Sequence, residues 1–148
     1  MEIRTLNDLL DAAAARRGGG LATQDERLSG AELRRRVLRA AAGLRAAGIG
    51  PGDRVALVLR NGIPFVVSYF ALARLGAAAV PLNFMVQRAE DLAHMLNDCR
   101  AAAAVAAEEF LPGLRAARAL AGTVRTLWVV DGEPGPGERP FAELLRGD

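Results

Sequence analysis

Residues 43–57 read GLRAAGIGPGDRVAL, which predicts the end of a helix, a glycine-proline turn and then a buried strand. Gly48, Gly50 and Gly52 resemble a dinucleotide-binding loop, but that motif places a strand first and opens a helix at its last glycine. Here the helix comes first, so the glycines are interpreted as a turn into the first core strand. A phosphate loop ending in Gly-Lys-Ser or Gly-Lys-Thr is excluded because the chain contains no lysine.

Helix and strand patterns alternate on both sides of this turn. Apolar spacing and capping residues predict a hairpin over 21–28, strands at 55–59, 77–82, 101–107 and 127–130, and helices at 5–17, from 29 onward, and at 65–75, 87–98 and 110–120. This alternation predicts an α/β fold, a doubly wound, mostly parallel sheet with flanking helices. Residues 1–130 are expected to form one α/β unit, and 131–148 a glycine-proline linker followed by a short helix.

The composition narrows the function classes. All 19 basic residues are arginine, which excludes a Schiff-base lysine and a lysine general base. Nucleic-acid binding is not expected, because acidic residues nearly balance the arginines and the single Trp and Tyr lie outside the basic clusters. The 30 alanines among the 148 residues predict a core built largely from small side chains.

Targeting signals are not recognised in the sequence. No signal peptide is expected at the N-terminus, and the apolar stretch 63–86 is interrupted by Arg74, Gly76 and Pro81, so it predicts core rather than a transmembrane segment. The single cysteine, Cys99, excludes an intramolecular disulfide. Together these features favour a cytoplasmic location.

The polar residues do not form a self-sufficient catalytic site, and neither a catalytic residue nor a metal ligand is assigned. His94, the only histidine, is interpreted as a structural or surface residue. Asn61 and Asn83 end strands and are interpreted as caps of the following helices, as are the carboxylates of Glu108 and Glu109. In a doubly wound sheet, ligands bind where strands end, so 60–62, 83–85 and 131–132 are the candidate loops.

Four motifs in a fixed order carry a family resemblance. They are LSGAEL at 28–33, GIGPGDRVA with NGIPF across 48–65, LGAAAVPLN at 75–83 and EDLAHMLNDC at 90–99. In order and spacing they resemble the opening of the AMP-dependent acyl-CoA synthetases and adenylating enzymes, most closely a fatty-acyl-CoA ligase. The resemblance implies an incomplete part of that family's large N-terminal domain. It also implies a parent ligase that uses ATP, Mg²⁺ and CoA to convert a carboxylic acid, fatty or aromatic, into an acyl-adenylate and then a thioester.

The resemblance also implies which parts are missing. The family's Ser/Thr/Gly-rich phosphate loop, ending in Pro-Lys-Gly, normally follows soon after the segment at which this chain ends. Residues 1–148 alone are therefore expected to be inactive and to bind none of these cofactors tightly. Relatives often carry an arginine two residues after the position of Asn83, and some of them use this arginine near CoA. This chain has Met85 at that position. The resemblance therefore leaves Asn83 and Arg88 as the candidate residues on the CoA side.

The expected partners are the remainder of a ligase chain and a small carboxylate substrate. Apolar surface left exposed for that remainder predicts self-association as a homo-oligomer. Three alternatives stay open: a non-catalytic binding module, one half of a split ligase, and part of an adenylation domain that serves a carrier protein.

Overall fold

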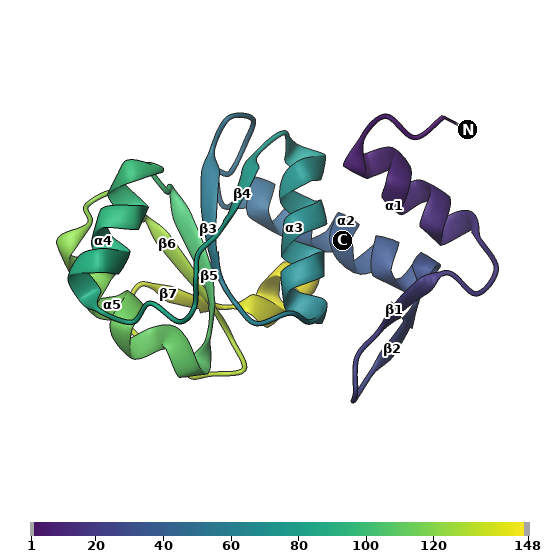
Figure 1. The fold of residues 1–148 in the computed structure, drawn as a ribbon. Helices are drawn as coiled ribbons and strands as arrows, with labels where there is room; N and C mark the ends of the chain where they lie inside the picture. The colour runs from purple at the N-terminus through teal and green to yellow at the C-terminus, as the bar shows by residue number, and fades with distance from the viewer. Residues whose placement is uncertain (1, 147–148) are drawn as a thin grey trace.

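The computed structural model describes residues 2–146 and has three layers (Figure 1). A five-stranded sheet in the order β4-β3-β5-β6-β7 lies between helices, and all its neighbouring strands are parallel. A separate antiparallel hairpin, β1–β2, stands near the N-terminal helix. The predicted doubly wound α/β fold is confirmed.

The N-terminal elements are α1 (Leu6–Ala15), β1 (Gly20–Ala22), β2 (Arg27–Ser29) and α2 (Gly30–Ala46). Thr5 forms a complete capping box with Asp8 at the start of α1. Ser29 caps α2 by accepting the N–H of Glu32 at 3.2 Å. The Glu32 carboxylate turns instead to arginines of its own helix, so only half of a capping box forms here.

The turn at residues 48–53 has the structure that its glycines predict. Gly48 and Gly52 adopt φ of +86° and +82°, a left-handed conformation that favours glycine. The Asp53 carboxylate accepts the N–H of Gly50 at 2.9 Å and closes the turn. The chain then enters β3 (Arg54–Val58), whose last four residues are buried.

Beyond β3 the elements alternate as predicted. They are α3 (Ile63–Leu75), β4 (Ala78–Pro81), α4 (Ala89–Asp98), β5 (Ala103–Ala107), the 3₁₀ helix η1 (Glu108–Phe110), α5 (Leu111–Leu120), β6 (Thr126–Val130), β7 (Glu138–Pro140) and the 3₁₀ helix η2 (Phe141–Leu145). Strand β7 was not predicted. It pairs with β6, and Phe141 and Leu144 after it are buried in the core, so the glycine-proline segment before it is a loop between two strands of one sheet.

The helices divide between the two faces of the sheet. Leu10 of α1, Leu44 of α2 and Leu72 of α3 are buried in one core cluster, together with residues of η2. Helices α4 and α5 cover the opposite face (Figure 1). Because β3 has β4 on one side and β5 on the other, the strand order switches direction between β3 and β5. Ligands bind at the carboxyl ends of the strands at such a switch point.

Large apolar side chains remain exposed near the N-terminus, at Ile3, Leu6 and Leu9. They lie on and just before α1, the outermost helix of its face in Figure 1. Self-association through apolar surface stays a prediction. Among residues 2–146, no helix combines the length and apolar character needed to cross a membrane.

Candidate functional site

A hollow of about 730 Å³ opens at the carboxyl edge of the sheet. It is lined by the loops that follow β3, β5 and β6, at Asn61–Gly62, Glu108 and Asp131–Gly132. Two of the three loops predicted to bind ligand therefore meet here. The third, at residues 83–85, follows the edge strand β4 and is not part of the lining.

The lining of the hollow combines apolar residues of the core with a distant part of the chain. The apolar residues include Val67 of α3, Val130 of β6 and Phe141 of η2, all of them buried. The tip of the β1–β2 hairpin adds Thr23 and its neighbours Asp25 and Glu26 to the wall. No local sequence pattern indicates that the hairpin lies at this site.

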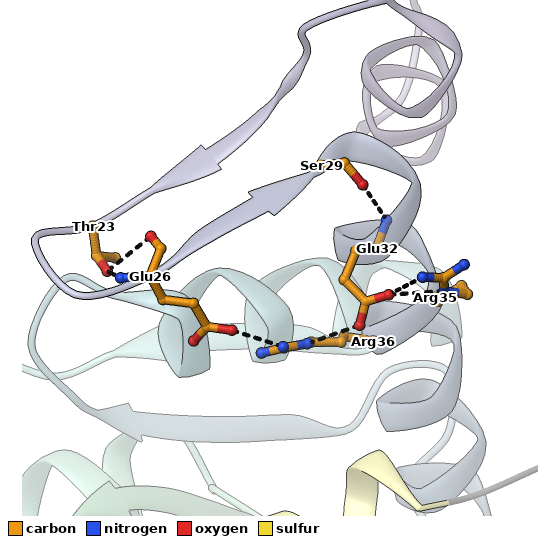
Figure 2. Close-up of polar contacts among 6 residues, drawn as sticks. All are labelled: Thr23, Glu26, Ser29, Glu32, Arg35 and Arg36. Atoms are coloured by element: carbon orange, nitrogen blue, oxygen red, sulfur yellow. Dashed lines mark hydrogen bonds and ion pairs between the residues drawn. The ribbon is translucent and has the colours of Figure 1, made fainter.

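A polar network joins the hairpin tip to α2, as Figure 2 shows. Arg36 donates to Glu26 at 2.7 Å and to Glu32, one turn earlier on α2, at 3.2 Å. Thr23 closes the tip by accepting the N–H of Glu26 at 3.1 Å. Side-chain hydrogen bonds from Arg35 and then Arg36 hold the pKa of Glu32 below its ordinary value. Arg36 thus restrains the hairpin tip at the rim of the hollow.

The charges around the hollow do not suit a nucleotide. Its lining includes five acidic side chains and one arginine, Arg36, which is already bonded to two carboxylates; the acidic residues are Asp25, Glu26, Glu108, Asp131 and Glu133. The chain has no lysine to offset them. Carboxylates repel phosphate oxygens, so the triphosphate of ATP does not fit this hollow by itself.

The loop after β4 carries the predicted CoA-side residues. The Asn83 side chain accepts the N–H of Met85 at 3.0 Å, which shapes the loop. Arg88 is the residue before α4; its side chain is 77% exposed and lies 3.8 Å from the carboxylate of Asp91. Neither residue lines the hollow, and their contact with CoA stays a prediction.

The interpretation of Asn61 and Asn83 as helix caps was wrong, and the Glu109 carboxylate has an arginine as its partner. No side-chain hydrogen bond caps α3 or α4, within the described residues, so neither Asn61 nor Asn83 caps the next helix. Glu109 instead receives two hydrogen bonds from Arg60, at 2.8 and 3.0 Å. The hydrogen bonds from Arg60 hold the pKa of Glu109 below its ordinary value. Arg60 and Glu109 each lie just beyond the carboxyl end of a strand, and these two strands, β3 and β5, are parallel neighbours. A prediction of the strand order and register would therefore have placed the two residues side by side.

The remaining candidate residues show no catalytic geometry. His94 lies exposed on α4, and Cys99 is partly buried with its Sγ 3.6 Å from the carbonyl oxygen of Leu96. Within residues 2–146, no three His, Cys, Asp or Glu side chains are grouped so that they could hold a metal ion.

Comparisons with known proteins identify the family. The AMP-binding enzyme family matches residues 10–146. The chain is 41% identical to salicyl-AMP ligase / salicyl-S-ArCP synthetase of Mycobacterium tuberculosis, over 90% of this chain and 25% of that protein. It is 42% identical to feruloyl-CoA synthase of an Amycolatopsis species, over 83% of this chain and 24% of that protein. The chain thus spans about a quarter of the length of these relatives.

Solved structures agree with this assignment. The N-terminal domain of FACL13 from Mycobacterium tuberculosis, with an inhibitor bound, superposes with a TM-score of 0.83 at 28% identity, over 97% of this chain and 36% of that one. The anthranilate CoA ligase AuaEII, in complex with anthranoyl-AMP, superposes with a TM-score of 0.88 over 97% of this chain and 28% of that one. At 24% identity that likeness concerns the fold alone. The alternating sheet, the ordered motifs and the family match lead to one conclusion: this chain belongs to the AMP-binding enzyme family.

Proposed function

We propose that this chain forms the N-terminal part of an AMP-forming ligase that activates an aromatic carboxylic acid and transfers it to CoA. The observation that carries the proposal is the family match over residues 10–146. The aromatic class is supported by the relatives of 41% and 42% identity, whose names specify salicyl and feruloyl groups. A fatty acid is the other substrate class, supported by the 35% identity to the long-chain-fatty-acid–CoA ligase FadD13.

In this proposal residues 1–148 supply scaffold rather than the chemical step. The hollow has an acidic rim, and the chain lacks lysine, so the phosphates of ATP are held by the remainder of the ligase. ATP supplies the activating adenylyl group when it is bound. The contribution of this chain is to place the loops after β3, β4 and β5 at one edge of the sheet, where Asn83 and Arg88 face CoA.

A complementation assay tests the proposal. Residues 1–148 are mixed with the Amycolatopsis feruloyl-CoA synthase from which the segment that matches this chain has been removed. We expect feruloyl-CoA and pyrophosphate from the mixture with ATP, and from neither part alone. Pyrophosphate release by residues 1–148 alone, over a panel of aromatic and fatty acids, would show that the chain is catalytically complete and contradict the scaffold role.

A carrier protein is the second candidate acceptor. It is favoured by the name of the Mycobacterium tuberculosis relative, which is a salicyl-S-ArCP synthetase as well as a salicyl-AMP ligase. Using that relative's remaining three quarters in the same assay, with CoA and a carrier protein offered separately, distinguishes the two acceptors by which thioester forms.

A further inference from the structure

Four side chains form a compact cluster beside the loop that follows β4. The two hydrogen bonds from Arg60, which follows β3, to Glu109 of η1 form a bidentate pair. The guanidinium carbon of Arg60 also lies 5.0 Å from the ring centroid of Phe84 and 5.6 Å from that of Phe110. The two rings stack with centroids 5.5 Å apart. We call these four residues the Arg60 cluster.

The cluster connects segments that the backbone leaves apart. Arg60 follows β3, Phe84 follows β4, and Glu109 and Phe110 follow β5. The last backbone hydrogen bond from the β4 segment to β3 is that of the Leu82 N–H to the Leu57 carbonyl, at 2.9 Å. Between Asn83 and Val86, no backbone hydrogen bond of the described residues joins the loop to the sheet, so side chains hold this part of the loop in place.

Exposed and partly buried side chains alternate along residues 83–86, so the position of Phe84 decides which side chains point outward. Phe84 and Val86 pack against the core, while Asn83 and Met85 are exposed, Met85 by 75%. At the far end of the loop, α5 approaches so closely that a Cβ on Gly113 would lie 2.7 Å from the carbonyl oxygen of Gln87. The loop is thus fixed at Gln87 by backbone packing and at Phe84 in two ways: the Gln87 side chain donates to the Phe84 carbonyl oxygen, and the Arg60 cluster holds the Phe84 ring.

Arginine is well suited to this position. Its planar guanidinium donates two parallel hydrogen bonds to one carboxylate while its faces remain free to lie over aromatic rings. Lysine carries the same charge but donates from a single point and cannot form the same fork. The geometry therefore requires the shape of the side chain as well as its charge.

We propose that Arg60 is a positioning residue that holds Phe84 inward, so that Asn83 and Met85 are presented outward at the edge of the sheet. Its effect on CoA binding rests on the proposed function, in which this loop faces CoA. The structural part of the inference, the orientation of residues 83–86, stands independently of that function.

The first test uses residues 1–148 alone. The chain has three methionines, so ¹³C-methyl labelling gives Met85 a signal that can be resolved, and amide hydrogen exchange reports on residues 83–86. In Arg60→Gln we expect the Met85 methyl signal to shift or broaden and these amides to exchange about five- to tenfold faster, the range for losing an exposed ion pair with a cation–π contact. Arg60→Lys is expected to restore only part of the difference.

The matched control is Arg115→Gln. Arg115 of α5 makes a similar bidentate pair with Glu138 of β7, at 2.9 and 2.8 Å, but does not take part in the Arg60 cluster. We expect the Met85 signal to be unchanged in this variant. An equal change in Arg115→Gln, an unchanged Met85 signal in Arg60→Gln, or full recovery with lysine would overturn the proposal.

The second test uses the complementation assay with feruloyl-CoA synthase. Arg60→Gln is expected to raise the KM for CoA about five- to tenfold, with kcat and the formation of feruloyl-AMP nearly unchanged. Equal losses in both half-reactions would contradict a role at CoA. If the unaltered chain fails to complement, the proposed function fails, and the methyl signal and hydrogen exchange still decide the positioning role of Arg60.

Discussion

The two faces of the sheet are packed in different ways. The face covered by α1, α2 and α3 receives large side chains from the strands, among them Val55, Leu57 and Trp128, the last fully buried. The face covered by α4 and α5 receives mostly alanines from β3 and β5, with larger side chains from the end of β3 and from β6; these strand residues are Ala56, Val58, Ala104, Ala106, Leu127 and Val129. The two central strands β3 and β5 therefore turn mostly large side chains to the first face and mostly alanines to the second.

This difference indicates how each layer is held. Large side chains bury more apolar area against the layer that includes α2, α3 and η2. Small side chains let helices approach the strands closely, so that face depends on the absence of bulk. Removing volume should therefore damage the first face most, and adding volume the second.

The largest expected effect is that of Trp128→Ala. It removes the largest fully buried side chain of the first face, and such truncations cost about 3–5 kcal/mol because a cavity remains. Urea unfolding monitored by circular dichroism measures the loss. Leu120→Ala is the control, since the exposed Leu120 of α5 should change stability by less than about 0.5 kcal/mol. A loss of stability below about 1 kcal/mol for Trp128→Ala would contradict the idea that the first face depends on large buried side chains.

The second effect is that of Ala104→Leu on the face covered by α4 and α5. Ala104 is fully buried, and added methylene groups in a well-packed core cost about 1–3 kcal/mol. The same unfolding experiment applies, with the exposed Ala119→Leu of α5 as the matched control. An unchanged free energy of unfolding in Ala104→Leu would mean that the space beside Ala104 can hold a larger side chain. The alanines would then reflect the overall composition of the chain and not a need for close packing.

The smallest effect concerns the outermost helix of the first face. Asp11 of α1 accepts from Arg34 of α2 at 2.6 Å and lies 3.4 Å from Arg74 of α3. The hydrogen bond from Arg34 is the main cause that lowers the pKa of Asp11 from 3.8. At neutral pH, Asp11→Asn should reduce stability by about 1 kcal/mol or less, because the pair is partly exposed.

The pH dependence of this effect has a definite sign. A carboxylate with a lowered pKa stabilises the folded state above its ordinary value, 3.8 here, and loses that contribution as the pH falls through its lower folded value. The stability difference between the wild type and Asp11→Asn should thus stay constant from pH 7 to 5 and shrink below 3.8. Urea titrations at pH 7, 5 and 3.5 measure it, with Asp98→Asn on α4 as control. A difference that grows with acid would exclude this role for Asp11.

Much of the fold was predictable because the central strands are continuous apolar runs. Residues 55–59 predicted a buried strand, and the last four residues of β3 are buried. Strand β7 lacks such a run: Glu138, Arg139 and Pro140 join the sheet at its edge, where few residues are buried. Its pairing with β6 depends on the following Phe141 and Leu144 being drawn into the core.

The candidate site was only partly predictable. The loops at Asn61–Gly62 and Asp131–Gly132 were identified because ligands bind where parallel strands end. The hairpin tip was missed, because its place at the hollow depends on the contact of Glu26 with Arg36 across ten residues. The partnership of Arg60 and Glu109 spans 49 residues and was likewise hidden from local patterns.

The sequence by itself determined the alternation of helices and strands, the structural role of the turn at Gly48–Asp53 and the family of the chain. These follow from local periodicity, from backbone conformations that favour glycine, and from the order of short motifs. Only the tertiary structure decided which strand ends adjoin one another and which charges meet there. The reason is that strand order and register, which no local pattern encodes, place Arg60 beside Glu109 and the hairpin tip beside the hollow.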